Sequence, residues 1–290
     1  MSINLLDIPE TFITVSGISR PLTLVHITDS HLRDLDQRDS AIFTDDESQY
    51  FHPSSYRRSN LRAAIDMSNS LPADAIIFTG DMMNYPSAAN LDEFRLQVER
   101  IQSPYLYTLG NHDWHFPSLP WNDQVRAQYY SRFNEFTNDN PAFQAFDLDG
   151  IRLLMVDNSN YQVSQEQLSF LKQQADTAKS CFLFMHIPLC LPKLKIRTTE
   201  KWREPILIGA EGWTEETRKK WMIRADDPST TEFYNWILQD SKSNIKAIFS
   251  GHVHFDHEEP IGSSCTQYVT NAGYDGGCRI IRIVPVALFN

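Results

Sequence analysis

Short apolar runs and helical periodicities alternate along most of the chain. Runs rich in β-branched and aromatic residues predict strands at 22–27, 75–79, 104–109, 181–185, 245–249, 267–270 and 279–286. Between them, apolar residues recur at helical spacing over 54–71, 91–101 and 233–237. His26 stands inside the first run, and we expect it to be a hydrogen-bonded core residue. The alternation of strand and helix favours an α/β fold.

The middle of the chain adds an antiparallel feature. Residues 143–148 and 151–156 flank the Asp-Gly pair at 149–150, whose tolerance of positive φ predicts a tight hairpin turn. Ser164, followed three residues later by Gln167, predicts a capping box at the start of a helix. Together with the strands above, this predicts a mixed sheet, or two packed sheets, covered by helices on the outer faces.

The length of 290 residues accommodates one large domain or two ordinary ones. No linker divides the chain, so we expect a single domain over residues 1–290. The stretches 33–56 and 192–229 are long, polar and weakly periodic, which predicts two loop insertions. Long loops in compact domains are usually functional lids or mobile insertions, and the sequence leaves open whether these two form a lid.

The charge and the absence of certain segments exclude several classes of protein. There are 26 Lys and Arg against 37 Asp and Glu, a net charge of −11, which repels a polyanion and excludes a general nucleic-acid coat protein. The first residues show no basic region followed by an apolar run, and no uncharged apolar stretch of about 18 residues occurs. The four cysteines lack the spacing of a zinc knuckle. We therefore expect a cytoplasmic protein without membrane association.

Side chains that can bind metal ions follow five of the predicted strands. They are Asp29, His31, Asp81, Asn111, His186, His252 and His254. Because the carboxyl ends of parallel strands meet at one edge of a sheet, we expect these side chains to converge. Such a mixed N/O set suits Fe, Mn, Zn, Co or Ni better than Ca or Mg. Asp81 could bridge two ions ~3.5–4 Å apart, as in two-metal hydrolases.

The order of these motifs resembles that of the calcineurin-like metallophosphoesterases. The motifs are D-S-H at 29–31, G-D at 80–81, G-N-H-D at 110–113, the histidine at 186 and G-H-V-H at 251–254. The resemblance implies an α/β fold in which two mixed β-sheets, flanked by helices, form a four-layer αββα sandwich. It also implies a binuclear metal site at the carboxyl ends of the strands. One ion would be held by Asp29, His31, Asp81 and His254, and the other by Asp81, Asn111, His186 and His252.

The reaction expected from this site is hydrolysis of a phosphate ester. A hydroxide bridging the two metal ions would attack phosphorus in line. His112 adjoins Asn111 without being counted as a ligand, and it would protonate the leaving alkoxide. Asp113 could orient the His112 ring and hold its protonated form. The resemblance assigns His112 the same role.

A phosphodiester is the first expectation for the substrate. A phosphomonoesterase acting on small molecules or phosphoproteins, and a metal-binding scaffold without activity, remain alternatives. Several aromatic residues stand in predicted loops or near the motifs: Tyr50, Phe51, Tyr56, Trp114, Phe116, Trp121, Trp202, Trp213 and Trp221. Core packing is the commoner fate of such residues, but rings can also stack on a base, so the small substrate could be nucleotide-like. The sequence leaves open the metal identity and the oligomeric state.

Overall fold

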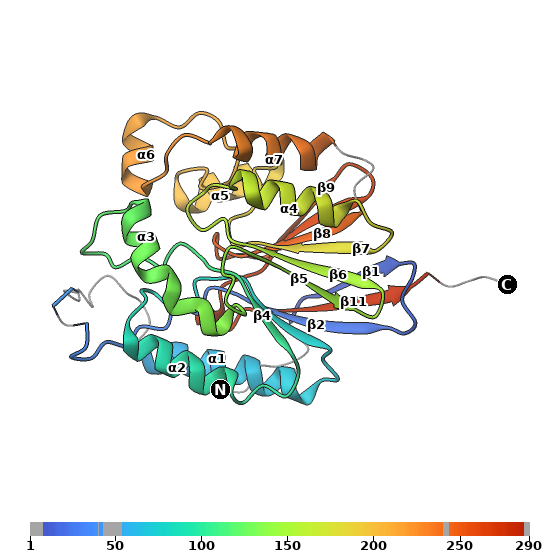
Figure 1. Cartoon of the computed structure of the whole chain (residues 1–290), viewed down its shortest axis with the longest axis horizontal. Helices are drawn as coiled ribbons and strands as arrows, with labels where there is room; N and C mark the ends of the chain where they lie inside the picture. The colour runs from blue at the N-terminus through green and yellow to red at the C-terminus, as the bar shows by residue number, and fades with distance from the viewer. Residues whose placement is uncertain (1–7, 40, 43–53, 240–243, 287–290) are drawn as a thin grey trace.

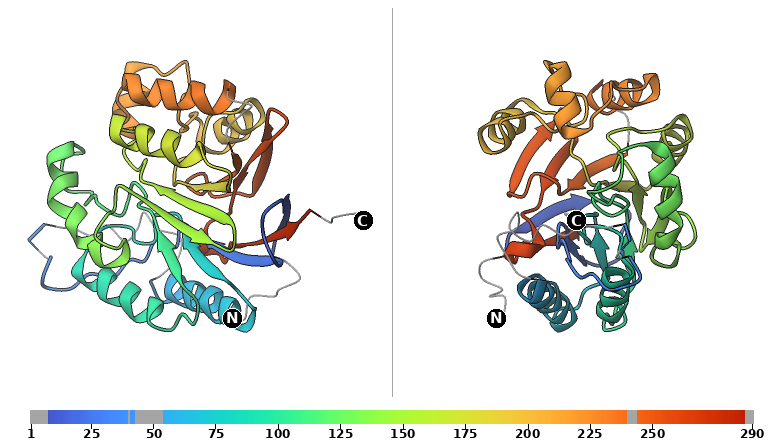
Figure 2. Two further views of the ribbon diagram at one scale, coloured as in Figure 1. Left: turned by 45° about the vertical axis from the view of Figure 1, so that its right-hand side comes forward. Right: turned by 90° about the vertical axis from the view of Figure 1, so that its left-hand side faces the viewer.

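Two β-sheets lie face to face in the middle of the protein, and helices cover the outer face of each (Figures 1 and 2). The structure is a computed structural model that describes residues 8–39, 41–42, 54–239 and 244–286. Within these residues, the first sheet contains five strands, in the order β1 (Glu10–Val15), β11 (Arg279–Pro285), β2 (Leu22–Ile27), β3 (Ala75–Phe78) and β4 (Tyr105–Tyr107). The second contains six, in the order β5 (Phe143–Leu148), β6 (Ile151–Val156), β7 (Ser180–Phe184), β8 (Ile245–Ser250), β10 (Cys265–Val269) and β9 (His257–Ile261).

Helices form the two outer layers. α1 (Ser54–Ser70) and α2 (Ala88–Val98) pack on the first sheet, at the bottom of Figure 1, and α4 (Gln165–Ala175) and α7 (Pro228–Gln239) pack on the second. The other helices described are α3 (Asp123–Tyr130), η3 (Ser131–Phe136), α5 (Pro192–Trp202), α6 (Glu215–Trp221) and η4 (Gly273–Asp275). The predicted α/β sandwich of two mixed sheets with flanking helices is confirmed.

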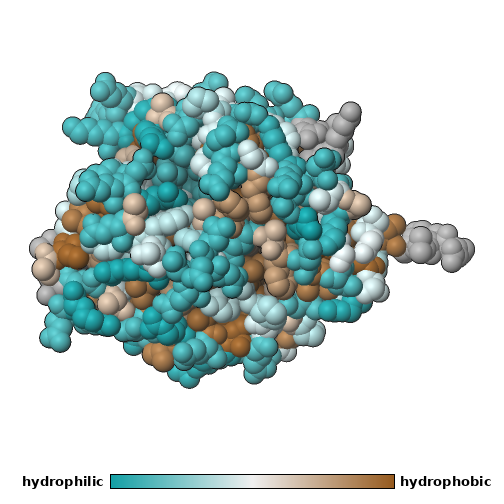
Figure 3. All heavy atoms as spheres, viewed as in Figure 1, coloured by the Kyte–Doolittle hydropathy of each residue, from teal (hydrophilic) through white to brown (hydrophobic). Residues whose placement is uncertain are grey.

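The central strands are buried on both faces. Every residue of β2, β3 and β7 is buried, as their near-continuous apolar runs predict. Between the sheets, Leu24 and Ile77 of the first sheet share one core with Phe182 and Phe249 of the second. The face of the molecule in Figure 3 is mostly hydrophilic, with apolar side chains interspersed. Three clusters of buried apolar residues therefore hold the two sheets and their helices together through the hydrophobic effect.

Parallel pairing places the ends of the central strands together. β2, β3 and β4 run parallel, and so do β6, β7, β8 and β10. Backbone hydrogen bonds then join the turns that follow them. The N–H of Asp29 donates to the carbonyl of Gly80, and the N–H of Gly251 donates to that of His186, each at 3.0 Å. Turns that are distant in sequence thus meet at the carboxyl ends of the strands.

Two local predictions are confirmed. β5 and β6 pair antiparallel across the turn at 149–150. At α4, the Ser164 hydroxyl accepts from the backbone N–H of Gln167, whose side chain accepts from the backbone N–H of Ser164.

The prediction of a loop over 192–229 is wrong, because this segment contains α5 and α6. α5 buries only Leu194 and Thr198 among its helical positions, and α6 buries only Thr217. Charged residues make up much of both helices, so the segment is polar on average and resembles a loop in composition. The strands β1 and β9 were also not predicted. Both lie at the edge of a sheet, and β9 contains an acidic run.

The second predicted loop is only partly described. Of the stretch 33–56, residues 40 and 43–53, which include Tyr50 and Phe51, lie outside the described residues, and α1 already begins at Ser54. The assignment of the whole chain to one domain stays a prediction. Among the described helices, none combines the length and the apolar character that crossing a lipid bilayer requires.

His26 in β2 is the predicted hydrogen-bonded core histidine, and it leads to a pH prediction. Its Nδ1 and Nε2 lie 2.8 Å and 2.7 Å from the hydroxyls of Thr270 and Thr79. Burial, with the charge of Arg279 second, lowers the pKa of His26 from 6.5 to about 3. The unfolded chain therefore takes up this proton first. The stability that His26 contributes is complete above pH 6.5 and is lost as the pH falls towards 3.

We expect His26→Gln to make the free energy of unfolding less dependent on pH below about pH 6.5. Between pH 6 and 4, the free energy of unfolding of the unsubstituted protein should fall more steeply, by up to about 1.4 kcal/mol for each pH unit. Urea unfolding of both proteins at a series of pH values, with a chelator present, measures this difference. Parallel profiles would contradict it.

Candidate metal centre

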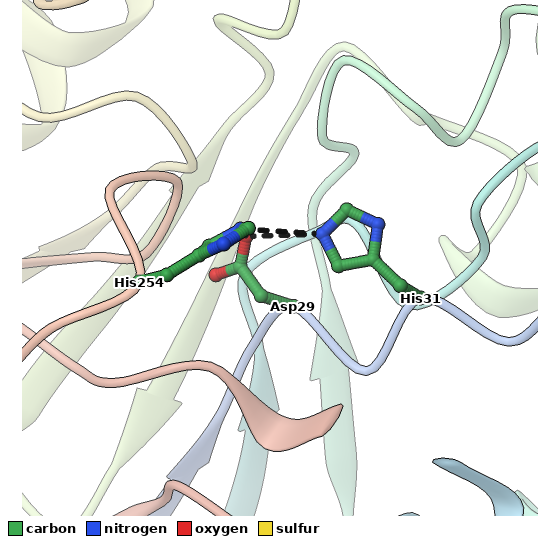
Figure 4. Close-up of side chains that lie close together, drawn as sticks. All are labelled: Asp29, His31 and His254. Atoms are coloured by element: carbon green, nitrogen blue, oxygen red, sulfur yellow. Dashed lines mark hydrogen bonds and ion pairs between the residues drawn. The ribbon is translucent and has the colours of Figure 1, made fainter. Parts of the chain in front are cut away.

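Asp29, His31 and His254 form the first of two side-chain clusters at the carboxyl ends of the strands (Figure 4). Asp29 and His31 follow β2, whereas His254 follows β8, so the cluster joins the two sheets. Asp29 Oδ1 lies 3.0 Å from His254 Nε2 and 3.7 Å from His31 Nε2, and the two Nε2 atoms are 3.3 Å apart. One small cation could contact all three side chains.

Asp81, His186 and His252 form the second cluster, with Asn111 beside them. His186 Nε2 lies 3.1 Å from both Asp81 Oδ2 and Asn111 Oδ1. The same Asp81 oxygen is 3.7 Å from Nε2 of His31 in the first cluster. Asp81 therefore stands between the clusters, where a bridging carboxylate would have to be. The structure brings together all seven residues predicted as ligands, and their role as ligands stays a prediction.

The backbone at this site is held in a conformation that most residues avoid. Five of the seven residues have positive φ: Asp29 (53°), His31 (47°), Asp81 (51°), His252 (70°) and His254 (57°). Non-glycine residues in this region cost energy and tend to gather at functional sites. The preceding turns also need glycine, because a Cβ on Gly110 would lie 2.2 Å from the Asp81 carboxylate and one on Gly251 would lie 2.2 Å from that of Asp29. Glycine at these two positions thus lets the backbone of each turn approach the carboxylate of another turn closely.

Each imidazole of the clusters is held through its other ring nitrogen. The partners are the Thr79 carbonyl for Nδ1 of His186 (2.7 Å), Asn84 Oδ1 for Nδ1 of His31 (3.3 Å), the Tyr274 hydroxyl for Nδ1 of His254 (3.1 Å) and the Tyr161 hydroxyl for Nε2 of His252 (2.9 Å). For His186, Nδ1 faces the Thr79 carbonyl, so Nε2 is the nitrogen directed towards Asp81 and the one that a metal ion would contact. Such contacts orient metal-binding histidines and fix their tautomer.

Sequence reasoning missed these supporting residues and Asn158. Asn158 Oδ1 accepts hydrogen bonds from the N–H groups of His186 (3.1 Å) and Ile187 (3.0 Å), and its amide donates to the Ile187 carbonyl (2.7 Å). A signal was present, because Asn158 follows the apolar run 151–156 as the predicted ligands follow theirs. Asn158 therefore fixes the turn that presents His186.

The charges of the clusters favour a cation. Burial opposes ionisation of Asp29 and Asp81, but interactions with His254 and His186 outweigh it and hold the pKa of each carboxylate below its usual range. Burial would lower the pKa of His186, but Asp81 raises it to about 9. Burial lowers the pKa of His31 to about 4 and that of His252 to about 3, which keeps these rings in the neutral form that binds metal. The N/O donor set and its negative charge therefore fit transition-metal ions.

His112 forms a third group of possible metal ligands with His31 and Asp81, next to the two clusters above. Its ring centroid is 4.8 Å from that of His31, and its imidazole can approach the same cation as Asp81 and His31. Nδ1 lies 3.2 Å from the backbone carbonyl of Asn84. When this nitrogen donates its proton to the carbonyl, Nε2 is the ring atom that can donate a proton to a bound molecule.

The predicted contact between Asp113 and the His112 ring is wrong, because Asn84 takes that place. The Asp113 carboxylate accepts from the backbone N–H groups of Asp81 (2.9 Å), Met83 (3.1 Å) and Gly110 (2.7 Å). Burial, followed by the charge of Asp81, raises the pKa of Asp113 to about 7. Asp113 thus connects the turn that carries Asp81 with the turn that carries Gly110, and it is a positioning residue for Asp81.

A cavity of about 280 Å³ opens above the clusters. Its lining includes four candidate ligands (Asp81, Asn111, His252 and His254), then His112, His115, Trp121 and Tyr161, and finally Trp202, Ile206, Lys220, Trp221 and Met222. The latter group belongs to α5, α6 and the residues next to them. The segment predicted as a loop therefore forms one wall of the cavity.

Comparison with known protein families agrees with this geometry. The family model described as calcineurin-like phosphoesterase matches residues 22–256, which includes every residue of the two clusters. The chain belongs to this family. The calcineurin-like phosphoesterase family implies a binuclear metal centre, for which the two clusters are candidate ligand sets.

The relatives of this calcineurin-like phosphoesterase match parts of it. A protein of Fibrobacter succinogenes named as a probable cyclic nucleotide phosphodiesterase is 26% identical over 137 residues, 46% of this chain and 49% of that protein. A protein of Rhodococcus erythropolis with the same name is 27% identical over 161 residues, 52% of this chain and 46% of that protein. The chain thus spans about half the length of these relatives.

Among solved structures, a dimetal phosphatase from Danio rerio has the same fold. Its TM-score is 0.54 at 12% sequence identity, and the alignment covers 87% of this chain and 88% of that chain. At this identity the likeness concerns the fold alone.

Proposed function

We propose that this protein hydrolyses phosphodiesters at the two clusters. The observation that carries the proposal is the position of Asp81, which contacts His186 and stands near His31, with the His112 imidazole adjacent. Asp29, His31, Asp81 and His254 would hold one metal ion, and Asp81, Asn111, His186 and His252 the other. Fe, Mn and Zn all suit these ligands. Two such ions, when bound, lower the pKa of a coordinated water and neutralise charge on the phosphate.

The protein's own groups would handle the leaving group. Asn84 holds His31 with its side chain and His112 with its carbonyl, so one residue sets the spacing of a metal ligand and a proton donor. The Asn84 carbonyl faces Nδ1 of His112, so Nε2 is the ring atom that would deliver a proton to the departing alkoxide. Asp113 keeps the Asp81 turn in register with Gly110 during this step.

The placement of the basic side chains around the cavity favours a phosphodiester over a phosphomonoester as the substrate. A monoester dianion would benefit from positive side chains beside the metal ions, and among the described residues that line the cavity, Lys220 is the only Lys or Arg. The basic residues near the site have other partners. Arg57 donates to the His31 carbonyl, Arg58 pairs with Asp34 and Glu93, and Arg197 donates to the Asp256 carbonyl. The names of the two relatives also support a diester substrate.

The relative rates for two aromatic phosphates test this preference. With protein loaded separately with Mn and Fe, we expect kcat/KM for bis-p-nitrophenyl phosphate to exceed that for p-nitrophenyl phosphate by at least about tenfold, or ~1.4 kcal/mol in transition-state free energy. A larger kcat/KM for the monoester would favour a phosphomonoesterase. Metal binding without turnover of either substrate would favour a metal-binding scaffold.

A further inference from the structure

Two tryptophan rings extend outward from the first metal-ligand cluster. The ring centroid of Trp202 lies 5.3 Å from that of His254, and that of Trp221 lies 6.0 Å from that of Trp202. The indole N–H of Trp202 donates to the Val253 carbonyl at 2.9 Å, which fixes this ring against the G-H-V-H turn. We call Trp202 and Trp221 the aromatic wall. It begins at a candidate metal ligand and continues into the cavity.

The cavity beside the aromatic wall is small and has further apolar lining. Trp121, Ile206 and Met222 line it together with the aromatic wall. The volume of about 280 Å³ is near the lower limit of ordinary small-ligand pockets, roughly 300–1,000 Å³. A phosphate at the base of the cavity would therefore leave room for one compact substituent beside the tryptophans.

The charges on the aromatic wall limit what that substituent can be. Lys201 Nζ lies 5.6 Å from the centroid of Trp202, and Lys220 Nζ lies 5.5 Å from that of Trp221. Aromatic rings attract cations, but each of these rings already has a lysine ammonium near it. A cationic headgroup such as choline would be repelled. A neutral planar ring can still stack on an indole.

We propose that the aromatic wall is a substrate subsite for the base of a nucleoside phosphodiester, with the phosphate at the two clusters. This inference rests on the proposed function. Trp221 would bind the base, and Trp202, fixed by Val253, would hold Trp221 at the distance that a ribose spans. The wall belongs to α5 and α6, so this helical segment would determine which diester is accepted while the motif turns determine the chemistry.

The test compares two diesters in metal-loaded protein. For Trp221→Leu, we expect KM for 3′,5′-cyclic AMP to rise by about tenfold or more, the order of one base–aromatic contact. The KM for glycerophosphoglycerol, a diester with neither a base nor a cationic group, should stay unchanged. Trp221→Phe should recover much of the affinity, because it keeps an aromatic face. Trp213→Leu is the matched control, since Trp213 belongs to the same segment and does not line the cavity. It should leave both KM values unchanged.

Equal changes of KM for the two diesters in Trp221→Leu, or an unchanged KM for cyclic AMP, would overturn the subsite. A binding measurement separates this result from failure of the proposed function. If the unsubstituted protein hydrolyses neither diester, AMP should still quench its tryptophan fluorescence. The AMP concentration that gives half-maximal quenching should rise about tenfold in Trp221→Leu and stay unchanged in Trp213→Leu. Absence of quenching, or equal quenching in both variants, would overturn the subsite on its own.

Discussion

Asp81→Asn should abolish the activity of this phosphoesterase while leaving the fold intact. The Asp81 carboxylate lies near imidazoles of both clusters, 3.1 Å from His186 Nε2 and 3.7 Å from His31 Nε2. An amide has the same shape but lacks the negative charge that two cations share. Metal ions contribute several kcal/mol to stabilising the transition state, and losing about 4 kcal/mol lowers the rate about a thousandfold. We therefore expect kcat/KM for bis-p-nitrophenyl phosphate to fall by at least about a thousandfold.

Metal content and rate should be measured on the same preparations. The variant should hold at most one tightly bound metal ion per chain by elemental analysis, whereas the unsubstituted protein should hold two. Asp147→Asn is the control, because Asp147, which belongs to β5, forms surface ion pairs with Arg152 and Lys179. It should preserve both ions and the rate. Two bound ions and near-normal turnover in Asp81→Asn would show that Asp81 does not bridge the clusters.

His112→Ala should slow the reaction in proportion to how much the leaving group needs a proton. The His112 ring is adjacent to the clusters, and its Nδ1 lies 3.2 Å from the Asn84 carbonyl, which leaves Nε2 for proton transfer. General acid catalysis contributes about 10²–10⁴-fold, so we expect this loss in kcat for diesters with alkyl leaving groups. Nitrophenolate departs without protonation, so the loss for bis-p-nitrophenyl phosphate should be much smaller.

The experiment compares kcat for alkyl and nitrophenyl diesters, with metal content determined in parallel. His115→Gln is the matched control, because His115 lines the same cavity and its Nε2 contacts the Leu119 carbonyl. It should show no dependence on the leaving group. An equal loss for both substrates in His112→Ala, or loss of a metal ion, would indicate that His112 positions the centre or binds metal rather than donating a proton.

Local sequence patterns were sufficient to predict the buried strands and the candidate metal ligands of this protein. Continuous apolar runs mark β2, β3 and β7, because strands buried on both faces have no polar side to expose. Polar motifs directly after such runs mark the candidate ligands, because parallel pairing places strand ends together. Side-chain type and position along a strand are both local properties. The convergence of seven distant residues could therefore be predicted without any knowledge of distances.

The contacts that support the site were decided by the tertiary structure. Asp113 stands next to His112 in sequence, yet its carboxylate bonds to three backbone N–H groups, and the ring contacts Asn84 from another turn. Adjacent side chains in a turn point in different directions, which residue order does not reveal. Likewise, α5 and α6 are highly charged and bury few residues, and only their packing on the second sheet places Trp202 and Trp221 in the cavity wall. Burial and strand pairing follow from local composition, whereas a hydrogen-bond partner depends on direction and distance, which exist only once the chain has folded.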